Sequence, residues 1–168
     1  MVSESNLILN KKQVLQKVKR IAFEIYEHNV LEKEIVLCGI YDRGYILADL
    51  LANELKKISS LKISVVRIDL EKGDPGHNDV HFDRDLKELK NKSIIIVDDV
   101  LNTGKTLIYS LRPLLNLEIK KLQIAVLVDR NHKQYPVYAD FVGYSLATTI
   151  KEHIEVVFDD NRFGVYLL

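Results

Sequence analysis

Residues 93–107, with the sequence SIIIVDDVLNTGKTL, constrain the fold of this chain more than any other segment. Positions 94–97 hold four consecutive β-branched residues, which is typical of a strand buried on both faces of a parallel sheet. We expect this strand to end at Asp98 and Asp99. Ligands of open α/β sheets gather beyond the carboxyl ends of the strands, so the two carboxylates are predicted to lie at a ligand-binding edge.

A short polar turn follows the two carboxylates and leads into a helix that we expect over residues 106–115. The turn supplies hydroxyl groups, a glycine that permits close backbone approach, and free amide N–H groups, which together suit a phosphate dianion. Adjacent side chains on a strand point to opposite faces, but a sugar with several hydroxyls can engage both carboxylates. The segment therefore predicts a site for a sugar that carries phosphates. The turn residues are Asn102, Thr103, Gly104, Lys105 and Thr106.

Two other interpretations of this segment fit the residues less well. The first is a solvated strand end followed by a capped helix, which would not require the acidic pair, the hydroxyl groups and the glycine to occur together. A Walker-type phosphate loop needs an earlier glycine in the pattern Gly-x4-Gly-Lys-Ser/Thr, and this chain has Asp99 at that position. The spacing therefore argues against a nucleoside triphosphatase.

The segment resembles the phosphoribosyl-pyrophosphate (PRPP) signature of type I phosphoribosyltransferases: a hydrophobic run, Asp-Asp, small residues and Thr-Gly-x-Thr. In that family the acidic pair contacts the ribose hydroxyls, Mg2+ sits on the sugar and pyrophosphate, and the turn holds the 5′-phosphate. The resemblance implies that Asp98 and Asp99 orient the ribose and reach Mg2+ indirectly, through PRPP hydroxyls and water. It implies that the phosphate is held by residues 101–106, from Leu101 onward.

Residues 35–50, with the sequence IVLCGIYDRGYILADL, resemble the pyrophosphate loop of the same family. They consist of a predicted buried strand, a turn that contains glycine, and a helix. Arg43 is the expected pyrophosphate ligand, because a planar guanidinium matches pairs of phosphate oxygens. Asp42 and Gly44 belong to the same expected PRPP site, and Gly44 lets the backbone approach closely. The alternative is an arginine with only a solvating role.

Residues 122–150, LQIAVLVDRNHKQYPVYADFVGYSLATTI, resemble the pyrimidine operon regulators, a group of this family whose members are also uracil phosphoribosyltransferases. In that group the region forms the hood over the base, with residues 141–144 of this chain expected near the ring. A surface loop histidine is the alternative for His132. The residues implied at the nucleobase end are Asp129, Arg130, His132, Phe141 and Val142.

The middle of the chain, residues 66–90, should hold the loop that closes over PRPP in this family, with Arg67 on the strand before it. Glycines and a proline mark the loop as irregular. A metal site formed by His77 and His81 is disfavoured, because Asp-Pro-Gly precedes His77 and no partner cluster is evident. The loop markers are Gly73, Pro75, Gly76 and Asn78, and the candidate cations between Lys72 and Lys87 are His77, His81 and Arg84.

Predicted helices and strands alternate along the chain, which implies a parallel sheet covered on both faces. We therefore expect an α/β fold: one domain over residues 1–168, with a doubly wound parallel sheet and a small C-terminal hood formed mainly by residues 129–158. The expected helices are 11–29, 46–57 and 106–115, and the expected strands are 35–39, 62–69, 93–98, 123–129, 140–144, 154–158 and 162–168.

The composition agrees with one domain that has a full core, since the chain has 168 residues of which 47% are hydrophobic. No apolar run approaches the ~18 residues of a membrane helix, and MVSESNLILN lacks a basic leader, so we expect a cytoplasmic protein without a membrane partner. Cys38 is the only cysteine and lies in an apolar stretch, which indicates core packing. By resemblance, a homodimer or homotetramer is expected.

The resemblance implies a Mg2+-dependent enzyme of nucleotide metabolism, a pentosyltransferase of pyrimidine salvage that moves ribose 5-phosphate from PRPP to uracil. Two alternatives remain: a hypoxanthine or guanine phosphoribosyltransferase, and an RNA-binding regulator of pyrimidine genes that senses nucleotides with weak or no catalysis. The 24 basic and 24 acidic residues give a net charge of zero, which does not favour RNA as a partner. The cations between residues 11 and 20 alternate with apolar positions, as on the solvated side of a helix.

Overall fold

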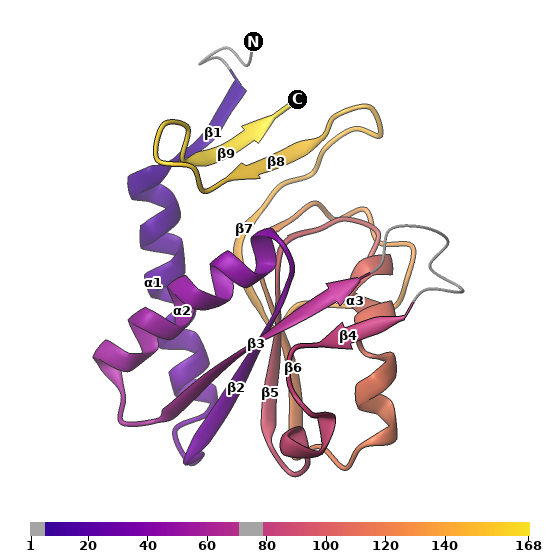
Figure 1. Ribbon diagram of the computed structural model, residues 1–168. Coiled ribbons are helices and arrows are strands. Elements are labelled where there is room, and N and C mark those ends of the chain that lie inside the picture. The colour runs from indigo at the N-terminus through magenta and orange to yellow at the C-terminus, as the bar shows by residue number, and fades with distance from the viewer. Residues whose placement is uncertain (1–5, 71–78) are drawn as a thin grey trace.

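A six-stranded sheet forms the centre of the computed structural model, which describes residues 6–70 and 79–168 (Figure 1). Neighbouring strands are parallel, except that the short edge strand β4 runs antiparallel to β3. This confirms the expected α/β fold. In spatial order the strands are β4 (Val80–Phe82), β3 (Lys62–Leu70), β2 (Glu34–Ile40), β5 (Ser93–Leu101), β6 (Lys121–Asp129) and β7 (Phe141–Ser145).

Different helices cover the two faces of this sheet, as a doubly wound architecture requires (Figure 1). One face packs against α1 (Lys11–His28) and α2 (Arg43–Ile58), and the other against α3 (Lys105–Ser110) and the 3-10 helices η2 (Leu86–Leu89) and η3 (Arg112–Asn116). Side chains alternate along β5, so Ile95 and Val97 join the first core while Ile94 and Ile96 join the second. This explains the unbroken apolar run.

A capping box fixes the start of α1. The Asn10 side chain accepts a hydrogen bond from Gln13 N at 2.9 Å, and Asn10 N donates to Gln13 Oε1 at 2.9 Å. The apolar positions that predicted the helix all face the core: Val14, Val18, Ile21, Ala22 and Ile25 are buried.

A second, three-stranded antiparallel sheet lies across the carboxyl end of the large sheet (Figure 1). Its strands are β1 (Leu7–Asn10), β9 (Gly164–Leu167) and β8 (Ile154–Val157), with β9 in the centre. Of the range expected to form the hood, 129–158, only β8 belongs to this sheet, because β7 pairs in parallel with β6 and joins the large sheet. The first and last strands of the chain complete the small sheet.

Three predicted boundaries differ from the structure by three residues or more. β5 continues past Asp98 to Leu101, because Val100 and Leu101 still pair with β6. The helix expected over 106–115 is interrupted: α3 ends at Ser110, and η3 follows with Pro113, which lacks the N–H that a continuous helix requires. α2 begins at Arg43, one turn before the expected start.

Three smaller expectations concern Cys38, membrane-spanning helices and the closing loop. Cys38 is fully buried in β2, and burial raises the pKa of its thiol to about 12, so it serves core packing. Among residues 6–70 and 79–168, no helix has the length and apolar character needed to cross a membrane. The expected loop positions Lys72, Gly73, Pro75, Gly76, His77 and Asn78 lie outside the described residues.

Candidate functional site

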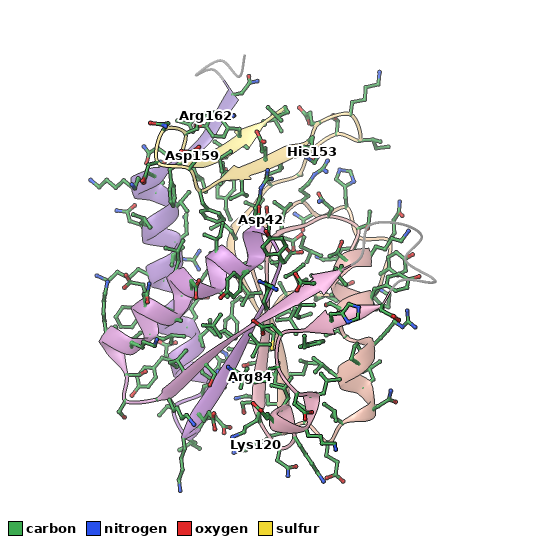
Figure 2. All side chains as sticks on the ribbon, in the orientation of Figure 1. Asp42, Arg84, Lys120, His153, Asp159 and Arg162 are labelled. Carbon is green, nitrogen blue, oxygen red and sulfur yellow. The ribbon has the colours of Figure 1, made fainter. Side chains whose placement is uncertain are left out.

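Three loops meet at the carboxyl edge of the large sheet, because β2, β5 and β6 are adjacent and parallel. They are residues 41–44 after β2, residues 98–106 at the end of β5, and residues 129–137 after β6. Figure 2 shows Asp42 at this edge, toward the small sheet, and Lys120 at the opposite edge. The expected ribose, pyrophosphate and nucleobase segments therefore share one edge of the sheet.

The two adjacent carboxylates on β5 have different environments. Asp98 is only 8% exposed and its Oδ1 accepts a hydrogen bond from Asp99 N at 2.9 Å, whereas Asp99 is half-buried. Burial, together with the nearby Asp99 carboxylate, raises the pKa of Asp98 well above its usual range. A cation, or the hydroxyls of a sugar, would stabilise the ionised form of Asp98.

The first turn of α2 packs directly against the end of β5. A Cβ atom at Gly44 would lie 2.6 Å from Val97 O and 3.0 Å from Asp98 Cα, so only glycine allows this approach. The preceding peptide bond, between Tyr41 and Asp42, is cis. The contact brings the expected pyrophosphate loop against the acidic pair.

Arg43 lies at the boundary between the two sheets. Its side chain is 42% exposed, and its Nη2 lies 3.6 Å from Glu155 Oε1 on β8. Glu155 also lies 3.4 Å from Arg162 Nη2, so one carboxylate is shared by two guanidinium groups. Asp42 is exposed and its side chain makes no capping hydrogen bond to α2. A weak, solvated ion pair leaves Arg43 available to an anionic ligand.

The expected phosphate loop encloses a small cavity lined by Asp98 and residues 100–107. Gly104 has φ of +87°, a left-handed conformation that strongly favours glycine. Lys105 N donates to Thr103 Oγ1 at 3.2 Å, and the side chains of Lys105 and Thr106 are exposed. Leu101 is buried beneath the loop. Polar side chains and peptide groups thus surround a space suited to an anion.

The segment after β6 holds this loop in place through backbone hydrogen bonds. Arg130 N donates to Leu101 O at 3.1 Å, and Gln134 N and Tyr135 N donate to Thr103 O at 2.9 and 3.0 Å. The roles of Gln134 and Tyr135 were not predicted, because main-chain hydrogen bonds leave no signal in side-chain identity.

Two of the residues expected at the nucleobase end, Arg130 and His132, line a second cavity. Asp129 is buried and lies 3.0 Å from Lys133 Nζ, a partner that the sequence did not reveal. His132 Nε2 donates to Thr148 O at 2.5 Å. The cavity has a volume of about 440 Å³ and shares Asn102 and Thr103 with the phosphate loop; its other lining residues are 130–134 and Ile150.

Phe141 and Val142 are not brought to this edge. Phe141 is 1% exposed, and its ring packs edge-on against His28 with the centroids 5.3 Å apart. It pairs with Ala125, four residues before Asp129 on β6, which corresponds to roughly 13 Å from the carboxyl end of the strand. Val142 packs into the core on the opposite face of the sheet.

The acidic pair suits a metal ion that the ligand helps to bind. Within residues 6–70 and 79–168, no group of three or more His, Cys, Asp or Glu side chains could hold a metal ion by itself. Mg2+ is commonly held by one or two carboxylates together with substrate phosphates and water. Asp98 and Asp99, next to an anion-binding loop, fit that donor set.

Residues 5–161 match the model of the phosphoribosyl transferase domain family. Among curated relatives, the bifunctional protein PyrR of Macrococcus caseolyticus is 33% identical over 98% of this chain and 99% of its own length. The bifunctional protein PyrR of Clostridium kluyveri is 35% identical over 89% of this chain and 88% of its own length.

Two solved structures have the same fold. The hypoxanthine phosphoribosyl transferase of Trypanosoma cruzi has a TM-score of 0.81 at 16% identity, covering 99% of this chain and 92% of that chain. A hypoxanthine-guanine phosphoribosyltransferase of Bacillus anthracis has a TM-score of 0.78 at 17% identity, covering 99% of this chain and 98% of that chain. At these identities the similarity concerns the fold alone.

Proposed function

Because this chain belongs to the phosphoribosyl transferase domain family and, within it, to the bifunctional PyrR group, we propose that it transfers ribose 5-phosphate from PRPP to a nucleobase, with uracil as the acceptor. Pyrophosphate is the second product. The observation that carries the proposal is the contact of Gly44 with β5, which joins the Arg43 loop to Asp98. One ligand can therefore touch a guanidinium, two carboxylates and an anion-binding loop.

In the proposed reaction a nucleobase nitrogen displaces pyrophosphate from C1 of the ribose. Asp98 and Asp99 orient the ribose hydroxyls and stabilise the positive charge that develops at C1. Arg43 stabilises the negative charge that grows on the leaving pyrophosphate, since a guanidinium binds phosphate oxygens in pairs. When bound, Mg2+ neutralises part of the pyrophosphate charge. No side chain needs to act as a covalent nucleophile.

The choice of uracil rests on the resemblance of residues 122–150 to the pyrimidine operon regulators, whose members are also uracil phosphoribosyltransferases. The ionic side chains near the second cavity have partners within the protein, as in the Asp129–Lys133 ion pair. Base contacts are therefore expected to come largely from peptide groups, which do not distinguish pyrimidines from purines by residue type. Hypoxanthine and guanine stay in the tested set for this reason.

The decisive experiment measures pyrophosphate release from PRPP and Mg2+ with uracil, hypoxanthine, guanine, adenine and orotate in turn. Release with uracil alone supports the proposal, and release with a purine alone replaces uracil with that purine. Retained PRPP binding without release would exclude the transferase reaction and leave a nucleotide sensor. The Asp98→Asn/Asp99→Asn double variant is the negative control.

A second candidate function, RNA binding by a nucleotide-sensing regulator, has one supporting observation. The exposed side of α1 borders a groove of about 490 Å³ lined in part by Gln13, Gln16, Lys17, Arg20 and Tyr144. Both cations of this groove are engaged, because Arg20 pairs with Glu24 and donates to two carbonyls, and Lys17 lies over the Tyr144 ring. Salt-dependent binding of RNA, reduced by Lys17→Glu, would support this function, and binding that is absent or unaffected by salt would exclude it.

A further inference from the structure

Arg130 is a buried cation at the junction of the two cavities. Its side chain belongs to a residue only 9% exposed, and its guanidinium makes four hydrogen bonds. Nε donates to Thr148 Oγ1 at 2.9 Å, and Nη1 donates to Asn102 Oδ1 at 2.9 Å. Nη2 donates to Glu152 O at 2.6 Å and to Thr149 O at 3.3 Å. These partners leave the guanidinium little capacity to contact a nucleobase.

All four acceptors are uncharged, although a buried guanidinium commonly pairs with a carboxylate. The nearby Glu152 carboxylate is engaged elsewhere, since its Oε2 accepts from Thr149 N at 2.6 Å. The ion pairs among the described residues do not include Arg130. Arg130 therefore has no carboxylate as a hydrogen-bond partner. The Glu152 carboxylate is nevertheless near enough that, after the hydrogen bonds from Thr149, the Arg130 charge also lowers the pKa of Glu152.

The contact with Asn102 also fixes the direction of the Asn102 amide. A guanidinium has only donors, so the amide atom that faces it must be the oxygen. The Nδ2 donors then lie on the other side of the amide group, and they form no hydrogen bond with another described residue. Asn102 lines both the phosphate-loop cavity and the second cavity. Its amide is therefore held as a donor toward a bound anion.

We propose that Arg130 is a positioning residue for the 5′-phosphate: it holds the Asn102 amide so that Nδ2 donates to the phosphate. This inference rests on the proposed function, because it concerns how the same site holds PRPP. It also revises the role expected from the resemblance, in which Arg130 lies near the base.

The test compares two ligands that occupy different parts of the site, ribose 5-phosphate and inorganic pyrophosphate, by calorimetry with Mg2+. Arg130→Lys keeps the charge but loses the planar fork, and Asn102→Ala removes the amide. Each should weaken ribose 5-phosphate by roughly 10- to 100-fold, as for the loss of a hydrogen bond to a charged group, and change pyrophosphate binding by less than about 3-fold.

Thr148→Val is the matched control. It removes a different hydrogen bond from the same guanidinium and leaves the Asn102 contact in place. We expect it to change the affinity for either ligand by less than about 3-fold. In turnover assays the Asn102→Ala variant should raise KM for PRPP much more than it lowers kcat, because the lost contact is remote from C1.

A double-mutant cycle separates positioning from general support. If Arg130 acts through Asn102, the Arg130→Lys/Asn102→Ala variant should bind ribose 5-phosphate about as weakly as the weaker single variant. Three results would overturn the proposal. The first is a double variant that loses affinity by the product of the two single-variant factors, the second is pyrophosphate binding that weakens as much as ribose 5-phosphate binding, and the third is normal binding of ribose 5-phosphate by Asn102→Ala.

Two further results keep the test decisive. If the Arg130 variants fail to fold, the Asn102→Asp variant tests the proposal in their place. Its carboxylate can still accept a hydrogen bond from Arg130, but it presents an acceptor rather than a donor to the phosphate. Ribose 5-phosphate should therefore bind at least roughly 10-fold more weakly. Unchanged binding would refute the inference. If the unmodified protein binds neither ligand, the proposed function itself fails, and this outcome differs from that of a protein that binds both ligands regardless of Asn102.

Discussion

Gly44 at the start of α2 lies so close to Asp98 on β5 that a methyl group at position 44 would be 3.0 Å from Asp98 Cα and 3.2 Å from Asp98 Oδ1. The two residues belong to separate loops of the proposed ligand site. Their contact brings the loop of Arg43 against the acidic pair, and in the proposed reaction these groups bind opposite ends of the PRPP pyrophosphate–ribose linkage. Several consequences can be measured.

Gly44→Ala should destabilise the protein and weaken pyrophosphate binding. The added methyl would meet Val97 O at 2.6 Å, so α2 must shift away from β5, at a cost of about 1–3 kcal/mol in the free energy of unfolding. Urea unfolding measures this cost. Glu54→Ala in the same helix loses an ion pair with Lys57, whose side chain is 68% exposed, and should cost less than about 1 kcal/mol. Equal effects of the two changes would refute the tight contact.

Asp98→Asn should stabilise the ligand-free protein at neutral pH. Because the pKa of Asp98 is raised in the folded state, the folded protein binds this proton more tightly than the unfolded chain. The stability that this proton contributes is complete below the unfolded pKa of about 3.9. This contribution to stability is lost as pH rises from the unfolded pKa toward the raised pKa of the folded protein. The total loss is about 1.4 kcal/mol for each pH unit between the two pKa values.

The free energy of unfolding, measured across pH for both proteins, checks the direction of this effect. The gap in stability between Asp98→Asn and the unmodified protein should widen from about pH 4 upward. Asp160→Asn is the control, since the Asp160 side chain is 92% exposed and pairs with Lys11 only at the surface. A gap that narrows with rising pH would contradict the raised pKa.

Replacing both carboxylates, as Asp98→Asn/Asp99→Asn, should abolish pyrophosphate release from PRPP while the fold persists. The two side chains sit at the sheet edge and would orient the ribose, so the loss falls on chemistry, by at least roughly 100-fold. Circular dichroism and pyrophosphate release are the two measurements. Full activity in a folded double variant would remove the ribose assignment.

Arg43→Ala should raise the inhibition constant of pyrophosphate by roughly 10- to 100-fold, because a charge-assisted contact is lost, while the KM for the base changes little. Lys57→Ala, near the other end of α2, is the matched loss of a cation and should leave both constants unchanged. Product-inhibition kinetics with pyrophosphate measure both constants in the two variants. If neither constant moved in Arg43→Ala, the pyrophosphate-loop assignment would be wrong.

Glu155→Gln should make pyrophosphate a slightly stronger inhibitor. Glu155 Oε1 lies 3.6 Å from Arg43 Nη2 and competes with the anion for the guanidinium. The pair is solvated and worth less than about 1 kcal/mol, so the expected gain is roughly 2- to 5-fold. A fall in pyrophosphate affinity would mean instead that Glu155 holds Arg43 in its binding position.

The sequence predicted the large sheet well because its strands are continuous apolar runs, as in residues 94–97. It placed the end of β5 too early, since the polar Asp98 and Asp99 suggested a strand end, but Val100 and Leu101 continue the pairing with β6. β1 was missed because it is only four residues long and its partner, β9, lies at the far end of the chain. Such pairing depends on tertiary structure and leaves no local pattern.

The candidate site was predictable where side-chain chemistry is local. The acidic pair, Arg43 and Gly104 were predicted from their motifs and from the family resemblance, and the structure gathers them at one edge, while their roles stay predictions. Phe141 was misleading, since an aromatic residue in the expected hood faces the core and packs on His28. Which end of a strand a residue occupies depends on register, and register is fixed by pairing partners that a single sequence does not reveal.

The pairing of β1 with β9 has a consequence for synthesis on the ribosome. The large sheet has all of its strands once residue 145 has emerged, whereas the small sheet cannot form until residues 164–167 follow and align with residues 7–10. The nascent chain can therefore assemble the phosphate loop first and add the strand that carries Glu155 afterwards. Arg43 can pair with Glu155 only after residues 154–157 have emerged.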